Sequence, residues 1–134
     1  MKKIILISSL ILNSVAFGAQ KNPQIRTCNS LGGVYLVAST NNDQVGLCQL
    51  DKAIVGALDL TLFNNKEAIT QSLNSYMKKQ TNCEPAGQIQ LITIVGGQSL
   101  KVCTYFDSSM IELATQLKGL DSSDNEKLNQ ALGL

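Results

Sequence analysis

The chain contains no histidine and no tryptophan, and only three tyrosines and three phenylalanines. Without histidine, the usual Ser–His and Cys–His nucleophile pairs and most catalytic zinc sites are excluded. With so few aromatic side chains, the core must be built from isoleucine, leucine, valine and alanine. Basic clusters are also missing apart from Lys2-Lys3 at the N-terminus and Lys78-Lys79. Because nucleic-acid binding depends on neutralising phosphates, we expect no nucleic-acid partner.

Long apolar runs are absent except at the N-terminus, where residues 1–19 have the pattern of a signal peptide. Two lysines come first, a short apolar run over 4–12 follows, and small residues precede cleavage after Gly18 or Ala19. The alternative is an uncleaved anchor, although the apolar run is about half of the length that a membrane span needs. No cysteine lies near the cleavage point, so the usual bacterial lipid-anchor site is missing. We therefore expect a periplasmic or secreted protein without a stable membrane span after cleavage.

Four cysteines in an exported chain predict two disulfides. Cys28 and Cys48 enclose nineteen residues, and Cys83 and Cys103 enclose the same number. The repeated spacing favours pairing within each frame, while cross-linking of the two frames is the rival connectivity. A Cys₄ zinc site is the functional alternative, but zinc sites bring cysteines in close CxxC-type pairs, which this chain lacks. We expect no metal and no cofactor.

The two cysteine frames suggest an internal repeat. In each frame a glycine stands four residues after the first cysteine, Gly32 in one and Gly87 in the other. An apolar run cut by a polar turn follows each glycine. The sequence therefore predicts a first unit over 20–82 and a second, diverged unit over 83–134 that packs on the first, unless the cysteine spacing is a coincidence.

Local signals predict the elements of each unit. Asn22 and Pro23 are typical of a helix start, and Gly32-Gly33 of its end. Polar turns, one over 41–43 and one at Gly96-Gly97, mark two hairpins. The expected strands are 34–38, 45–50, 88–95 and 100–106, and the expected later helices are 52–62, 65–80, 108–118 and 123–132.

Two isolated hairpins are only marginally stable, whereas joined hairpins covered by helices can share one core. We therefore predict an α+β fold. Two disulfide-stapled helix–hairpin–helix units would share a four-stranded antiparallel sheet, with the helices packed on one face.

Residues 22–50 resemble a small bacterial family of exported domains, domain of unknown function 333, whose members are often labelled hemolysins. The matching features are Asn22-Pro23, Cys28, Gly32-Gly33 and the segment 45–50 around Cys48. Members of that family continue with Pro-Asp-Gly, a third cysteine and a tryptophan. This chain has Val55 and Leu58 where that cysteine and tryptophan would fall, so the resemblance carries no active site.

Two carboxylates are the candidates for acid–base chemistry. Asp51 and Asp107 each follow a predicted hairpin, and by the repeat they could approach each other. The simpler interpretation is that both are helix N-caps. The glycine pairs Gly32-Gly33 and Gly96-Gly97 lack the spacing of phosphate-binding loops and are better interpreted as a helix end and a turn.

These features favour a non-catalytic binding module of the bacterial envelope or secretome. Its partner would be an envelope or secreted protein, and the hairpin tips at 39–44 and 96–99 would present the binding surface. A membrane-acting factor of the hemolysin kind is the second hypothesis. A small enzyme is the third. It is disfavoured because histidine is absent, the cysteines are expected in disulfides, and Asp51 and Asp107 are more simply interpreted as N-caps.

Overall fold

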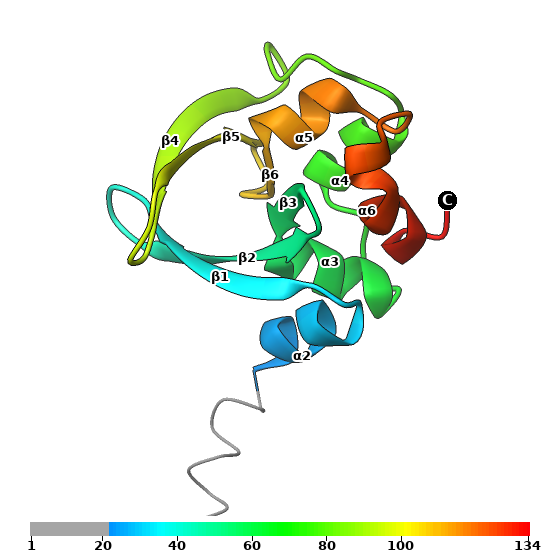
Figure 1. Ribbon diagram of the computed structural model, residues 1–134. Helices are drawn as coiled ribbons and strands as arrows, with labels where there is room; N and C mark the ends of the chain where they lie inside the picture. Colours follow the sequence, from blue (N-terminus) through cyan, green and yellow to red (C-terminus); the bar gives the residue numbers. More distant parts are fainter. Residues whose placement is uncertain (1–21) are drawn as a thin grey trace, which may run out of the picture.

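The computed structural model describes residues 22–134, so the predicted signal peptide lies outside the described residues. Six strands curve around one space, and helices α3 to α6 gather on one side of them, with α2 below (Figure 1). The elements in chain order are α2 (Pro23–Ser30), β1 (Val34–Ser39), β2 (Gln44–Leu50), β3 (Ala53–Gly56), α3 (Ala57–Asn64), α4 (Gln71–Met77), β4 (Gln88–Ile94), β5 (Ser99–Thr104), β6 (Met110–Glu112), α5 (Leu113–Lys118), the 3₁₀ helix η1 (Ser123–Asn125) and α6 (Glu126–Ala131).

The predicted four-stranded sheet is wrong, because the six strands close into an antiparallel barrel in the order β1-β2-β3-β6-β5-β4. The two missed strands, β3 and β6, lie in segments that the sequence predicts as helix. All four residues of β3 are buried. A short, fully buried strand has no alternation of apolar and polar residues, so its sequence cannot be distinguished from that of a buried helix.

The turn before β3 also differs from the prediction. Asp51 does not cap a helix; it has a positive φ of 62° in the two-residue turn with Lys52 that joins β2 to β3. The corresponding loop before β6 contains Ser108 at φ 70°, and α5 begins only at Leu113.

The helix predicted over 65–80 is shorter than expected. Its predicted N-cap, Asn64, is instead the last residue of α3, and α4 covers Gln71–Met77. Lys79 lies beyond the helix with φ 64°. The predictions at the two ends of the described chain hold better. Asn22 accepts hydrogen bonds from the first amides of α2, and a helical segment runs from Ser123 to Ala131.

The strand registers of the two halves are symmetric. Cys48 on β2 lies opposite Val55 on β3, and Cys103 on β5 lies opposite Ile111 on β6. Val55 and Ile111 then form the one residue pair that joins β3 to β6. On the other side of the barrel, β1 and β4 are joined through two pairs, one of which is Ser39 with Thr93. Each half therefore supplies a three-stranded meander, and two short contacts close the barrel.

Two apolar cores lie on the two faces of these strands. Side chains that alternate along β2, β3, β5 and β6 point either into the barrel or outward under the helices. The buried residues of the inner core are Ala38, Leu47, Ile54, Ile92, Val102 and Met110. The outer core contains both cystines together with Leu50, Val55, Leu60, Leu73, Tyr76, Ile111 and Leu128.

Both disulfides join the partners that the repeated spacing favours. Cys28 on α2 is bonded to Cys48 on β2, with 5.6 Å between their Cα atoms. Cys83, which precedes β4, is bonded to Cys103 on β5, with a Cα separation of 5.7 Å. Each bridge therefore ties the segment before a hairpin to the second strand of that hairpin.

Glycine is required beside each disulfide. A Cβ at Gly33 would lie 2.7 Å from the Cys48 sulfur, and one at Gly87 would lie 2.5 Å from the Cys103 sulfur. The structural counterpart of Gly87 is thus Gly33, one residue beyond the predicted Gly32. Gly32 instead has the positive φ of 84° that follows the end of α2.

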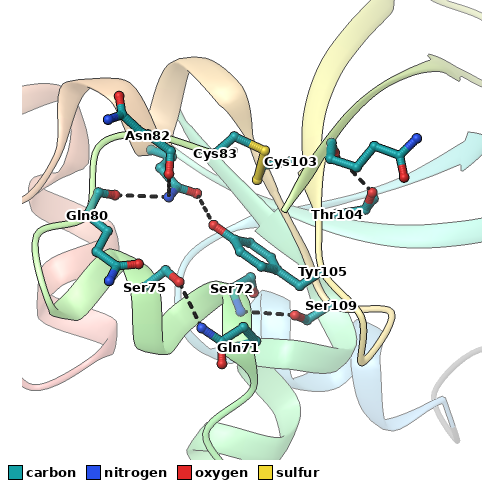
Figure 2. The surroundings of a disulfide bond; sticks show 12 residues. Gln71, Ser72, Ser75, Gln80, Asn82, Cys83, Cys103, Thr104, Tyr105 and Ser109 are labelled. Carbon is teal, nitrogen blue, oxygen red and sulfur yellow. Dashed lines mark hydrogen bonds between the residues drawn. A yellow bond between two sulfur atoms is a disulfide. The ribbon is translucent and has the colours of Figure 1, made fainter. Parts of the chain in front are cut away.

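Polar bonds hold the second disulfide in place (Figure 2). The Tyr105 hydroxyl donates to Gln116 Oε1 at 3.0 Å, and Gln116 Nε2 donates to the Gln80 carbonyl at 2.9 Å. Since Gln116 is 1% exposed, this chain of bonds fixes α5 against the segment that leads to Cys83.

Replacing Cys28 and Cys48 together by alanine is expected to lower the free energy of unfolding by about 3 kcal/mol, because the loop closed by the disulfide becomes free in the unfolded chain. Urea unfolding measures the change, and the Cys83→Ala/Cys103→Ala variant is the matched comparison. A loss below about 1 kcal/mol in both variants would contradict a stabilising role for the disulfides.

The substitution Gly87→Ala is expected to lower the free energy of unfolding by at least about 2 kcal/mol, because the new methyl group collides with the buried Cys103 sulfur and the Tyr105 ring. Gly97→Ala is the control, since its nearest neighbour would be 3.5 Å away and its stability should change by no more than about 0.5 kcal/mol. Equal effects in thermal or urea unfolding would show that the contact at Gly87 is relaxed.

Candidate functional site

The structure does not bring Asp51 and Asp107 together. They lie in the loops before β3 and β6, and these two strands run antiparallel with Val55 opposite Ile111. That register places Ala53 and Met110, the first residues of β3 and β6, three residues apart along the strands, which is about 10 Å. The alternative in which Asp51 and Asp107 form an acid–base pair is therefore wrong.

Asp107 does bind the start of a helix, but the helix is α4, far away in sequence. Its Oδ2 accepts a hydrogen bond from the Gln71 amide at 2.8 Å. Its Oδ1 accepts a hydrogen bond from the Ser109 hydroxyl at 2.5 Å. The Ser109 oxygen in turn accepts from the Ser72 amide at 2.9 Å (Figure 2). The loop before β6 thus holds the first turn of α4.

The carboxylate that lies near Asp107 is Asp59, in the first turn of α3. Asp59 is only 4% exposed, and its Oδ2 accepts hydrogen bonds from the Met110 amide at 3.1 Å and the Ser72 hydroxyl at 3.3 Å. Gly56 leaves room for this carboxylate, since a Cβ there would collide with Asp59 Oδ2. The sequence signal was Gly56 followed three residues later by an acid, which the prediction of one long helix over 52–62 obscured.

The environments of the two carboxylates shift their pKa values in opposite directions. The pKa of Asp59 is raised from 3.8 to about 6, mainly by burial and in smaller part by the negative charge of Asp107, while the hydrogen bonds from Met110, Thr70 and Ser72 oppose the rise. Burial also acts on Asp107, but the bonds from Ser109 and Gln71 outweigh it, so its pKa lies below the ordinary value. At neutral pH both side chains are ionised.

Asp59 and Asp107 line a cavity of about 310 Å³ at one end of the barrel, which we call the acidic mouth. Its other walls combine apolar and uncharged polar side chains. The lining residues are Gln24, Gln44, Val45, Gly46, Gly56, Leu58, Asp59, Leu62, Thr70, Asp107, Ser108, Ser109 and Met110.

The opposite end of the barrel has a cavity of about 270 Å³ without charged residues, which we call the apolar mouth. The registers relate the two ends: Val45 on β2 corresponds to Leu100 on β5, and Met110 on β6 corresponds to Ile54 on β3. The predicted hairpin tips lie beside these mouths, since Gln44 lines the acidic mouth and Gly97 and Gln98 line the apolar one.

A comparison of the two halves separates the structural role of Asp59 from its charge. The residue that corresponds to Asp59 is Thr115, whose hydroxyl oxygen accepts from the Ile54 amide at 3.0 Å. Thr115 also donates to Glu112 at 2.9 Å, but the strand amide itself is held by a neutral oxygen. A hydroxyl therefore suffices to bind the strand amide at this position of the repeat, and the corresponding Met110 amide does not require a carboxylate at position 59.

The acidic mouth has hydroxyls on its wall, from Thr70, Ser108 and Ser109. The two hydroxyls that contact the carboxylates, those of Ser72 and Ser109, are 0% and 3% exposed, and all four cysteines are in disulfides. Within residues 22–134, no group of three or more acids or cysteines could hold a metal ion. The arrangement is suited to binding a positively charged group, because two carboxylates face a cavity with apolar walls.

No helix of the described chain has the length and apolar character needed to cross a bilayer. Among protein-family models, curated proteins and solved structures, none matches this chain. The resemblance of residues 22–50 to domain of unknown function 333 therefore stays a prediction. The fold and the two cavities define the protein as a closed six-stranded barrel with one acidic and one apolar mouth.

The raised pKa of Asp59 predicts a pH-dependent stability. Because the folded protein holds this proton more tightly than the unfolded chain, the associated stability is present below pH 3.8 and is lost as the pH rises through about 6. Between pH 3.8 and neutral pH, the free energy of unfolding of the wild-type protein should fall by about 3 kcal/mol more than that of the Asp59→Asn variant. Urea unfolding across this pH range measures the difference. The same dependence of the unfolding free energy on pH in both proteins would contradict the raised pKa.

Proposed function

We propose that the protein is an exported, non-catalytic binding module and that it binds a protein partner at the acidic mouth. The observation that carries this proposal is the position of the Asp59 carboxylate. It is buried in a cavity, and its counterpart Thr115 meets the same structural need without a charge. An ionised Asp59 destabilises the fold at neutral pH, and groups that reduce stability are typical of functional sites.

The chemistry of the mouth supports binding rather than catalysis. Its two hydroxyls that contact the carboxylates are buried, and their hydrogen bonds hold α4 and the loop before β6 in place. A rigid scaffold that presents a preformed cavity is suited to recognition, because little freedom is lost on binding. The two disulfides provide that rigidity directly behind the β2 and β5 strands.

The experiment is selection of random heptapeptides displayed on phage against the immobilised, disulfide-bonded protein. Gln44→Trp should block the acidic mouth, because Gln44 is exposed at its edge. Gln98→Trp is the matched control, since Gln98 is an exposed glutamine at the edge of the apolar mouth. Enriched peptides should bind Gln44→Trp at least about tenfold more weakly than wild type and should bind Gln98→Trp normally.

Two outcomes would overturn the proposal. One is that no peptide is enriched, and the other is that the enriched peptides bind Gln44→Trp as well as they bind the wild-type protein. Circular dichroism and unfolding curves of both tryptophan variants verify that neither substitution has changed the fold.

A further inference from the structure

The charges of the acidic mouth all have one sign. Of its lining residues, only Asp59 and Asp107 are charged, and no lysine or arginine is among them. The ion pairs found in residues 22–134 lie elsewhere, between Asp124 and the side chains of Lys52 and Lys118. The negative charge of the mouth is therefore not neutralised by the described chain.

The apolar wall of the mouth indicates what kind of cation fits. Val45, Leu58, Leu62 and Met110 line the cavity together with the two carboxylates. Lysine and arginine side chains combine a charged head with a methylene stem that packs on apolar surface. A small inorganic cation would leave these apolar side chains without a contact, and it would require more oxygen or sulfur ligands than the mouth provides.

Exposed apolar side chains around the mouth indicate a macromolecule. Leu58, on the wall of the mouth, is 51% exposed. Phe106 does not itself line the cavity, but it directly precedes the lining residue Asp107 and is 85% exposed. Exposed aromatic and leucine side chains next to a cavity are typical of surfaces that a protein partner covers. Phe106 is also one of few aromatic residues in this chain, and its ring can contact a cation or an apolar side chain.

Resting on the proposed function, we infer that the acidic mouth binds the lysine or arginine side chain of a protein segment, and that apolar residues beside this side chain cover Phe106 and Leu58. The ammonium or guanidinium group lies between Asp59 and Asp107, and the stem lies along Val45 and Met110. Arginine can bind a carboxylate through two parallel hydrogen bonds, so it is expected to bind more tightly than lysine.

The pH response follows from the same geometry. Asp107 is the charged group that acts on Asp59 from the elements packed around it, and its own pKa is lowered. Below pH 6, Asp59 gains a proton and the mouth loses half of its negative charge. Binding of a basic peptide should therefore weaken on acidification.

The test uses four heptapeptide libraries in which the central residue is arginine, lysine, glutamine or glutamate, and the six flanking positions are random but exclude arginine and lysine. The arginine and lysine libraries should yield peptides that depend on the acidic mouth, and the glutamine and glutamate libraries should yield none. For the selected peptides, Asp59→Asn and Asp107→Asn should each weaken binding about tenfold or more. Glu112→Gln, which neutralises a half-buried carboxylate that does not line the acidic mouth, is the matched control and should leave binding unchanged.

Two further measurements separate charge recognition from a loss of structure. Binding by the wild-type protein should weaken about tenfold from pH 7.5 to pH 5, and this dependence should disappear in Asp59→Asn. Asp59→Thr introduces the residue found at the corresponding position of the other half, so the Met110 amide keeps an acceptor and the variant should fold. It should no longer bind the basic peptides. Phe106→Ser should weaken the binding of peptides with apolar flanking residues without changing the preference for a basic central residue.

The outcomes distinguish the inference from the proposed function. Peptides with central glutamine or glutamate that depend on the mouth would overturn the basic-side-chain inference and leave the binding function intact. Peptides that bind the Gln44→Trp variant as tightly as the wild-type protein would overturn both the inference and the proposed function. Unchanged binding of the basic peptides in Asp59→Asn and Asp107→Asn, with both variants folded, would also reject the inference.

Discussion

The pairing of β3 with β6 is the contact on which the rest of the structure depends. Only Val55 and Ile111 pair directly, so two further bonds cross between the halves. The Ile54 amide donates to Thr115, and the Met110 amide donates to Asp59. These bonds satisfy strand amides that such a short ladder leaves free, since an unpaired buried amide would be strongly destabilising. They also attach α3 and α5, which begin directly after the two strands, to the opposite half.

Closure at this contact determines where the apolar surface is buried. The strands that meet there have one face in the barrel and one face under the helices, so they contribute to both cores. The disulfides lie on the helix side and attach the segments that enter each half. A four-stranded sheet would have left open edges, whereas the short third strand of each half removes them on this side of the barrel.

The functional asymmetry comes from the same contact. Each half needs one acceptor for a strand amide, and the halves use different side chains: a carboxylate with Gly56 beside it in one, and a hydroxyl bound to Glu112 in the other. Only the first opens into a cavity that it lines with Asp107. The two ends of the barrel have a similar backbone but differ in charge, and that difference distinguishes the proposed binding site from a structural junction.

Much of the local structure could be predicted from the sequence. The cap at Asn22, the two hairpins and the paired cysteine frames depend on residues close together along the chain or on a repeated spacing, and the structure has them all. The third strands could not be predicted, because a buried run such as 53–56 has the same pattern in a strand and in a helix. The site was missed for a related reason, since Asp59 was interpreted as part of a helix that begins five residues too early.

The sequence by itself thus determined the elements with local signals and the disulfide framework. Only the tertiary structure decided that the sheet closes, and that Asp59 rather than Asp51 lies near Asp107. Burial and through-space neighbours set the charge state and the accessibility of a carboxylate, and neither is encoded in the residues next to it. The register of β3 against β6 brings those neighbours together.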